Sequence, residues 1–148
     1  MSAVSTPRVP IYFYSSSFGL VSTFVRRLDR PAFNLAEREH RRTQTQGPWV
    51  LLTPSYKAGS DDNDTIPEPV RRFLASANNR RRMVGVIGSE NRNFDEHYQQ
   101  AARRIAAASG RPVLFEFELS GTTWDSDRCA AILHALDESL AAQGAAST

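Results

Sequence analysis

The sequence contains very few cysteine and histidine residues. Cys129 is the only cysteine among 148 residues, which excludes an internal disulfide, a two-cysteine redox motif and a thiolate metal cluster. Any redox chemistry must therefore come from a bound cofactor. The three histidines, His40, His97 and His134, have no evident nucleophile partner. We expect them to be surface or packing residues, and we predict neither a side-chain catalytic group nor a metal site.

Long apolar runs are also absent. No stretch approaches the roughly 20 apolar residues that a membrane-spanning helix needs. The N-terminus "MSAVSTPRVP" lacks the positive start and apolar core of a secretion signal. We therefore expect a soluble protein of the cytoplasm with no membrane partner. The length fits one compact domain, residues 1–148, with frayed tails at 1–8 and 142–148.

The basic residues are almost all of one kind. Seventeen arginines accompany a single lysine, Lys57, and the formal net charge is +2. Aromatic residues are not interleaved with the arginines, so a solvated face explains them and we predict no nucleic-acid partner. A basic patch such as Arg71, Arg72 and the triplet 80–82 can steer an acidic partner, but the sequence alone does not assign these residues to a docking face.

Apolar runs alternate with amphipathic stretches along the chain. The runs predict strands at 9–14, 31–35, 49–53, 83–89 and 112–119, with a polar loop from the second strand to Gln46. The amphipathic stretches predict helices at 19–29, after a Thr65 cap with Pro67 in the first turn, from Asn93 to Ser109, and from about Asp125. This alternation, with continuously apolar strands, predicts a doubly wound α/β sandwich with a parallel sheet of about five strands.

The apolar positions of the predicted helices form their expected buried stripes. These positions are Val21, Phe24, Val25 and Leu28 in the first helix, Val70, Phe73 and Leu74 in the second, and Ile132, Leu133, Leu136 and Leu140 in the last. The fourth strand of the chain leads to a helix that Gly110 should end.

Polar loops follow the first, third and fourth predicted strands. In a doubly wound sheet, ligands bind beyond the carboxyl ends of the strands where the strand order reverses. The loops at 15–20, 54–62 and 89–94 are therefore the candidate site. The serines at 15–17 precede a helix N-terminus that can hold an anion, although they can equally bond their own backbone. Tyr56 is an aromatic on which a flat ligand could stack.

Several motifs resemble those of the NrdI family, the flavodoxin-like proteins that serve class Ib ribonucleotide reductase. "VGVIGSENRNFDEHY" and "GRPVLFEFELSGT" are similar to the family's "GVIASGNRNFGE" and "VPLLYRFELMGT". "TPSYKAG" is similar to "PSYGGG", and "IPEPVRRFLASANNR" to "VPRQVIRFLNDEHNR". The resemblance runs in register from about Ile11 to about Thr122 and is strongest over 83–122.

The resemblance implies a flavodoxin-like fold and a function. Members of the family bind FMN non-covalently and transfer single electrons. The resemblance implies that reduced FMN converts dioxygen into superoxide, which helps to generate the dimanganese-tyrosyl radical cofactor of the small reductase subunit, NrdF. The implied partners are an NrdF-type subunit and an electron-donating reductase. Two alternatives stay open: an interaction module that has lost or weakened its flavin binding, and a general one-electron carrier.

The resemblance also implies which residues contact FMN. The phosphate would lie at the first loop, and the isoalloxazine between the second and third loops. The implied cofactor-binding residues are Ser15, Ser16, Ser17, Phe18, Gly19, Pro54, Ser55, Tyr56, Lys57, Ala58, Gly59, Ser89, Glu90, Asn91, Asn93 and Phe94.

The chain differs from the family motifs at the predicted flavin site. The family's first loop reads approximately "SSxSENTxRF", whereas this chain has "SSSFGLVSTF". With fewer polar side chains there, we expect the serines and the backbone N–H groups of the helix start to hold the phosphate. Lys57 replaces a glycine and could stabilise an anionic reduced flavin, although a solvated loop lysine is the alternative. Glu90 also replaces a glycine, and we expect it to oppose negative charge on the ring.

Overall fold

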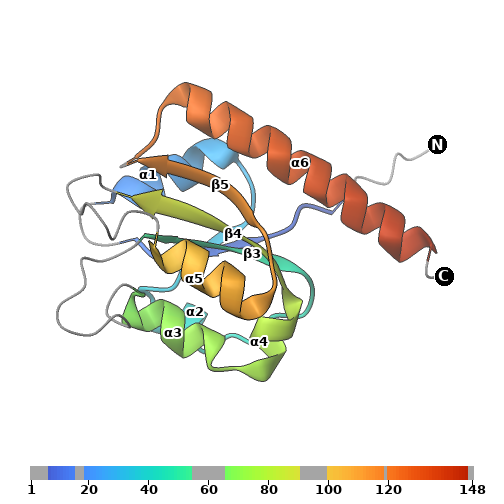
Figure 1. The fold of residues 1–148 in the computed structure, drawn as a ribbon, viewed down its shortest axis with the longest axis horizontal. Coiled ribbons are helices and arrows are strands. Elements are labelled where there is room, and N and C mark those ends of the chain that lie inside the picture. Colours follow the sequence, from blue (N-terminus) through green and yellow to red (C-terminus); the bar gives the residue numbers. More distant parts are fainter. Residues whose placement is uncertain (1–6, 16–18, 55–65, 91–99, 119, 147–148) are drawn as a thin grey trace.

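The computed structural model describes residues 7–15, 19–54, 66–90, 100–118 and 120–146. Five parallel strands form one sheet in the order β2-β1-β3-β4-β5, with helices on both faces (Figure 1). The strands are β1 (Ile11–Phe13), β2 (Ala32–Asn34), β3 (Trp49–Pro54), β4 (Met83–Glu90) and β5 (Val113–Glu118). The helices are α1 (Leu20–Leu28), α2 (Arg38–Arg41), α3 (Glu68–Leu74), α4 (Ala77–Arg82), α5 (Gln100–Ser109) and α6 (Thr123–Ala146). The predicted doubly wound α/β fold is confirmed.

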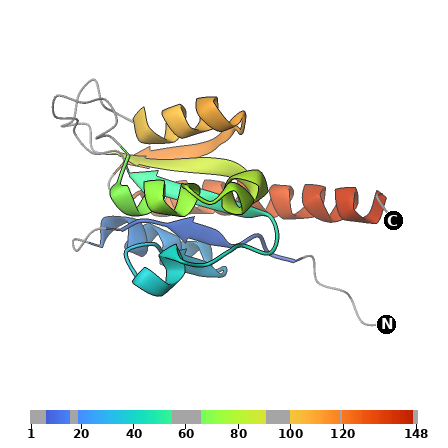
Figure 2. The same cartoon turned by 90° about the horizontal axis from the view of Figure 1, so that it is seen from below.

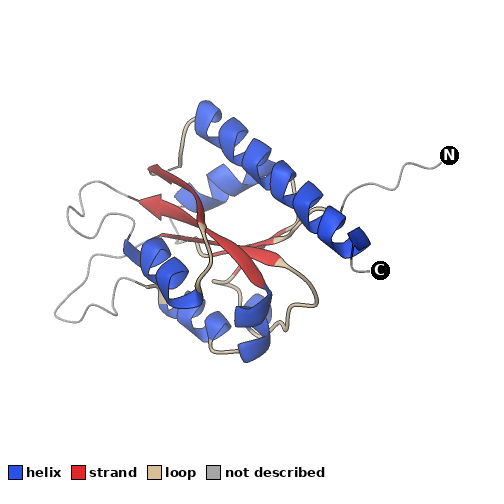
Figure 3. Ribbon diagram, turned by 45° about the vertical axis from the view of Figure 1, so that its right-hand side comes forward, coloured by secondary structure: helices blue, strands red, loops and turns tan. Residues whose placement is uncertain are grey.

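Two hydrophobic cores lie on opposite faces of the sheet. Helices α1 and α6 cover one face, and α2 to α5 lie on the other (Figures 2 and 3). The side chains of β3 alternate between the two cores, since Val50 and Leu52 face α1 and α6 while Trp49 and Leu51 face α3 and α5. All four are fully buried, which explains why this strand reads as a continuous apolar run.

The predicted stripe of α1 is confirmed, because its four apolar residues are all buried. Phe24 from this stripe stacks on Phe117 of β5, with 3.7 Å between the ring centroids and an interplanar angle of 14°. In α3, Val70 and Phe73 are buried as predicted, while Leu74 is only half-buried. Gly110 follows the end of α5 at φ +72°, the left-handed conformation that glycine adopts at a helix end.

Two short helices were not predicted. Helix α2 lies in the stretch after β2 that we expected to be a loop, and α4 directly precedes β4. They contain four and six residues, too few to show a helical period in the sequence. The start of α3 also differs from the prediction, because the helix begins at Glu68 with Pro67 at the N-cap position. The expected Thr65 cap lies outside the described residues.

Helix α6 is longer than predicted at both ends. It begins at Thr123, because Thr122 and Asp125 form reciprocal hydrogen bonds that cap it. The Thr122 N–H donates to Asp125 Oδ2 at 2.9 Å, and the Asp125 N–H donates to Thr122 Oγ1 at 3.1 Å. At the other end the helix continues to Ala146, into the segment that we expected to fray. Leu133 is fully buried, whereas the other three predicted core positions of this helix are half-buried.

Of the predicted N-terminal tail, the structure describes residues 7 and 8. Arg8 lies within that predicted tail, and its Nη1 donates a hydrogen bond to the backbone oxygen of Asp29 at 2.6 Å. Among the helices of the described segments, none combines the length and apolar character needed to cross a membrane.

Candidate functional site

The carboxyl ends of β1, β3 and β4 meet at one edge of the sheet. The parallel register pairs Phe13 with Leu52 between β1 and β3, and Pro54 with Ser89 between β3 and β4. Strand β1 pairs with β2 on one side and β3 on the other, so the strand order reverses between β1 and β3. In open α/β sheets this reversal creates the crevice in which ligands bind. The ends of three strands that we predicted to carry the site are thus neighbours.

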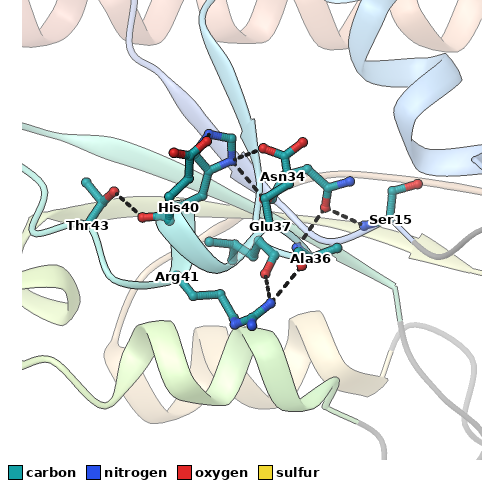
Figure 4. A network of polar contacts seen from close by, with 9 residues as sticks. Ser15, Asn34, Ala36, Glu37, His40, Arg41 and Thr43 are labelled. Atoms are coloured by element: carbon teal, nitrogen blue, oxygen red, sulfur yellow. Dashed lines mark hydrogen bonds and ion pairs between the residues drawn. The ribbon is translucent and has the colours of Figure 1, made fainter.

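Ser15 lies just after β1 and is buried, with 4% of its surface exposed. Its Oγ accepts a hydrogen bond from the Ser22 N–H at 3.2 Å, which places the hydroxyl on the first turn of α1. Its own N–H donates to Asn34 Oδ1 at 3.3 Å (Figure 4). At Ser15, therefore, the hydroxyl does bond to the backbone of the helix that follows, the alternative left open by the sequence. Its contact with a phosphate stays a prediction.

At the N-terminus of α1, the N-cap residue itself offers no side-chain cap, and Ser15 bonds only the N–H of the third helical residue, Ser22. Gly19 occupies the N-cap position at φ +73°, and a Cβ built on it meets nothing within 4 Å. The first turn contains no acidic residue. Within the described part of the chain, the N–H groups of Leu20 and Val21 meet no hydrogen-bond acceptor. A helix N-terminus carries roughly half a positive charge, so these groups suit a phosphate monoester such as that of FMN.

The ends of β3 and β4 continue the same edge of the sheet next to β1. Ser89 is buried and pairs with half-buried Pro54. The Thr53 hydroxyl, also buried, donates to the Pro54 carbonyl oxygen at 2.9 Å. Strand β4 is one residue longer than predicted, because Glu90 lies in the strand, paired with Glu118 of β5, and does not begin the loop.

The other predicted site residues lie outside the described part of the structure, so their roles stay predictions. They are Ser16, Ser17, Phe18, Ser55, Tyr56, Lys57, Ala58, Gly59, Asn91, Asn93 and Phe94.

Asn34, at the carboxyl end of β2, is a further residue next to this edge that the sequence does not predict as part of the site. Its Oδ1 accepts two hydrogen bonds, from the Ser15 N–H and from the Ala36 N–H at 3.0 Å (Figure 4). Its backbone oxygen lies 2.9 Å from His40 Nδ1. An asparagine that bonds the N–H two residues ahead forms an Asx-turn, and such a residue at a strand end is a signal that sequence reasoning can use.

Two of the three histidines, His40 and His134, lie in the described part of the structure. His40 is partly buried and contacts the Phe33 ring edge-on, with centroids 5.4 Å apart. It also lies near two exposed glutamates, Glu37 and Glu39, whose carboxylates it could share with an ion. His134 is exposed and pairs with Glu138 one turn away on α6. His97 lies outside the described residues.

The single cysteine is unsuited to chemistry. Cys129 belongs to α6 and is fully buried in the core that this helix shares with α1. Burial raises the pKa of its thiol to about 12, against a smaller opposing effect of the Arg30 charge. The thiol therefore stays protonated at neutral pH and is unreactive as a nucleophile.

Comparison with known proteins identifies relatives of the whole sheet region. The family model described as "NrdI Flavodoxin like" matches residues 11–131. The protein NrdI of Escherichia coli O127:H6 is 41% identical over 115 residues, which cover 78% of this chain and 84% of that protein. The protein NrdI of Shigella boydii serotype 4 is 40% identical over the same coverage.

Solved structures with low sequence identity share the fold. The metal-soaked Flv1 flavodiiron core from Synechocystis sp. PCC6803 superimposes with a TM-score of 0.65 at 14% identity, covering 92% of this chain and 37% of that one. Oxidised flavodoxin 2 from Bacillus cereus gives a TM-score of 0.56 at 12% identity, covering 90% of this chain and 99% of that one. These likenesses concern the flavodoxin-like fold alone.

Proposed function

Since the chain belongs to the NrdI family of flavodoxin-like proteins, which implies FMN as its cofactor, we propose that it serves as the redox accessory protein of a class Ib ribonucleotide reductase. When bound, FMN supplies one-electron transfer, and the proposed acceptor is dioxygen, which becomes superoxide. The proposed user of the superoxide is an NrdF-type small subunit, which assembles its dimanganese-tyrosyl radical cofactor. An electron-donating reductase would return electrons to the protein, and the cytoplasm is the proposed location.

One observation supports this proposal most directly: the N-terminus of α1, whose first two N–H groups have no acceptor among the described residues, follows β1 at the strand-order reversal between β1 and β3. The N–H groups of Leu20 and Val21 are directed to the space in front of the helix, as in other anion-binding termini. Gly19 adds no side chain there and allows a phosphate to approach the backbone closely. The phosphate would be held chiefly by backbone groups and serines, which is consistent with the apolar side chains of this loop.

In this proposal the chain's own residues bind and orient the cofactor. Ser15 holds the first turn of α1, and Pro54 and Ser89, at the paired ends of β3 and β4, would help to hold the cofactor. No described side chain acts as an acid or base. The protein thus contributes position and electrostatics, while the redox chemistry belongs to the cofactor.

The test has two stages. Apo-protein incubated with FMN and desalted should stay yellow with a stoichiometric amount of flavin. Reduced holoprotein plus oxygen should then raise the tyrosyl radical yield of a manganese-loaded NrdF, measured by electron paramagnetic resonance. The control is reduced free FMN at the same concentration. A radical yield equal to that of the control would contradict the proposed role in cofactor assembly.

A second candidate is an interaction module with weakened flavin binding. Leu20 favours it, because this apolar residue in the first turn of α1 is 43% exposed where a phosphate site usually offers polar groups. Protein that stays colourless after incubation with FMN but binds NrdF would support the module. Rapid electron transfer to unrelated acceptors without an effect on NrdF would instead support a general one-electron carrier.

A further inference from the structure

Asn34 joins the edge strand β2 to the start of the loop that follows β1. The register pairs Asn34 with Phe13, and the Leu35 N–H donates to the Phe13 oxygen at 2.6 Å. Beyond this last rung, the Asn34 side chain continues the contact by accepting from the Ser15 N–H at 3.3 Å. The amide oxygen also accepts from the Ala36 N–H at 3.0 Å, so it is held from both sides (Figure 4).

A relay of hydrogen bonds connects Asn34 to helix α1. The Asn34 side chain holds the Ser15 backbone, and the Ser15 hydroxyl in turn accepts from the Ser22 N–H at 3.2 Å. Ser22 is the third residue of α1, immediately after the two residues whose N–H groups have no acceptor in the described structure. The position of Ser15 therefore helps to determine where the N–H groups of the first turn of α1 lie relative to the end of β1.

Asn34 is itself fixed by the segment that follows it. His40 of α2 lies with Nδ1 2.9 Å from the Asn34 backbone oxygen and 3.2 Å from Glu37 Oε2. Both of these groups are acceptors, so Nδ1 carries the proton and donates. Arg41 donates to the backbone oxygens of Leu35 and Ala36, at 3.1 and 2.7 Å. The turn that holds the Asn34 amide is thus anchored at several points.

We infer that Asn34 is a positioning residue for the phosphate of FMN: through Ser15 it sets the geometry of the α1 N-terminus without touching the ligand. The inference rests on FMN binding and names how this chain achieves it. It accounts for a phosphate site with few polar side chains, because a backbone site needs its amides held in place before the ligand arrives. It also accounts for the residue type, since an uncharged amide accepts two N–H bonds without adding a negative charge beside an anion.

Asn34→Ala and Asn34→Asp separate the two parts of this role. Asn34→Ala removes the acceptor of the Ser15 N–H. The Ser15 amide hydrogen of the apo-protein should therefore exchange with solvent roughly five- to tenfold faster, which is the factor that corresponds to the net free energy of one hydrogen bond. FMN affinity should fall by about the same factor at any salt concentration. Asn34→Asp keeps both acceptors and therefore the slow exchange, but it should weaken FMN binding about tenfold at low ionic strength and less in 0.5 M salt.

Riboflavin, which lacks the phosphate, is the matched ligand. Its affinity should change less than about twofold in both variants, because no phosphate is held. Asn78→Ala is the matched protein control: the Asn78 amide donates to the Thr45 oxygen at 2.8 Å, at the amino-terminal end of the sheet. It removes comparable hydrogen bonds and should alter neither affinity. Dissociation constants would be measured by quenching of flavin fluorescence, and exchange by NMR.

Three results would overturn the inference. The first is an unchanged FMN affinity in Asn34→Ala. The second is an equal loss of FMN and riboflavin affinity, which indicates a general structural role. The third is an Asn34→Asp variant that binds FMN like the wild type at low salt. None of these measurements involves a reductase, so their outcome is independent of the radical assay that tests the proposed function.

Discussion

Asp137→Ala should destabilise the protein strongly without affecting the flavin site. Asp137 of α6 and Arg30 are 3% and 5% exposed and form a two-pronged ion pair, with N···O distances of 3.0 and 3.1 Å. The same carboxylate accepts from the Val9 N–H at 2.8 Å, just before β1. The pair therefore ties the last helix to the amino-terminal end of the central strands, opposite the candidate site.

The size of the loss in unfolding free energy follows from the groups that remain without a partner once the Asp137 carboxylate is removed. A buried guanidinium loses its charge partner, and its Nε already has no hydrogen-bond partner among the described residues. The Val9 N–H also loses its acceptor. Breaking a buried pair on one side costs about 3–5 kcal/mol, a large part of the about 5–15 kcal/mol that stabilises a typical domain. Asp137→Asn keeps one acceptor and should lose less.

Urea unfolding monitored by circular dichroism would measure the loss. The matched control is Glu68→Gln, which breaks the Arg72–Glu68 pair one turn apart on α3, where both side chains are about two-thirds exposed. Such pairs contribute about 0.3–0.5 kcal/mol. FMN affinity of the folded Asp137→Asn variant should equal that of the wild type. A loss below about 1 kcal/mol in Asp137→Ala would refute the reasoning, because the buried charge would then have found water or another partner.

Packing and burial lead to further predictions. Gly121→Ala should cost about 2–4 kcal/mol, because Gly121 has φ +68° and its new Cβ would lie 2.7 Å from the buried Phe24 ring. Gly47→Ala, with nothing within 4 Å of the new Cβ, should change the melting temperature little. Cys129 should resist an aromatic disulfide reagent at pH 8 until the protein is unfolded. Because its folded pKa of about 12 exceeds the ordinary 9.0, stability should fall between pH 9 and 12 by up to about 1.4 kcal/mol per unit relative to Cys129→Ala. Trp124→Ala should leave the free energy of unfolding within about 0.5 kcal/mol, since Trp124 is 65% exposed.

The sheet and its main helices could be predicted because their signals are local and periodic. Strand β3 is apolar on both faces, and α1 has its buried residues on one side. In both cases the spacing of apolar residues in the sequence therefore predicts which residues are buried. Short elements leave no such pattern. Helix α2 has no buried residue at all, so its four residues read as a polar loop.

The start of helix α6 is encoded in the sequence by a capping pair. Thr122, followed three residues later by Asp125, is a capping pair that gives the helix start directly. The apolar stripe is clearest from Ile132 onward, and the start that it predicts, at about Asp125, lies two residues after the observed start at Thr123. Caps locate helix ends better than periodicity does, because they are bonds to the terminal N–H groups themselves.

The site shows a different limit of sequence reasoning. The rule for doubly wound sheets correctly directs attention to the strand ends on either side of the order reversal, and Ser15 was found in this way. The rule does not point to β2, because β2 is the edge strand and the strand order reverses between β1 and β3. Asn34 was missed for that reason.

The contact between Asn34 and Ser15 depends on register, which the sequence of neither segment contains. Had β2 shifted by one residue, Leu35 would stand where Asn34 now reaches the Ser15 N–H, and the side chains would face opposite sides of the sheet. The register is set by the burial of Leu35 in the same hydrophobic core as Val70 and Phe73 of α3. This packing does not depend on whether a flavin binds. A residue that orders a phosphate site can thus be fixed by packing on another strand, and resemblance to a binding motif alone does not find it.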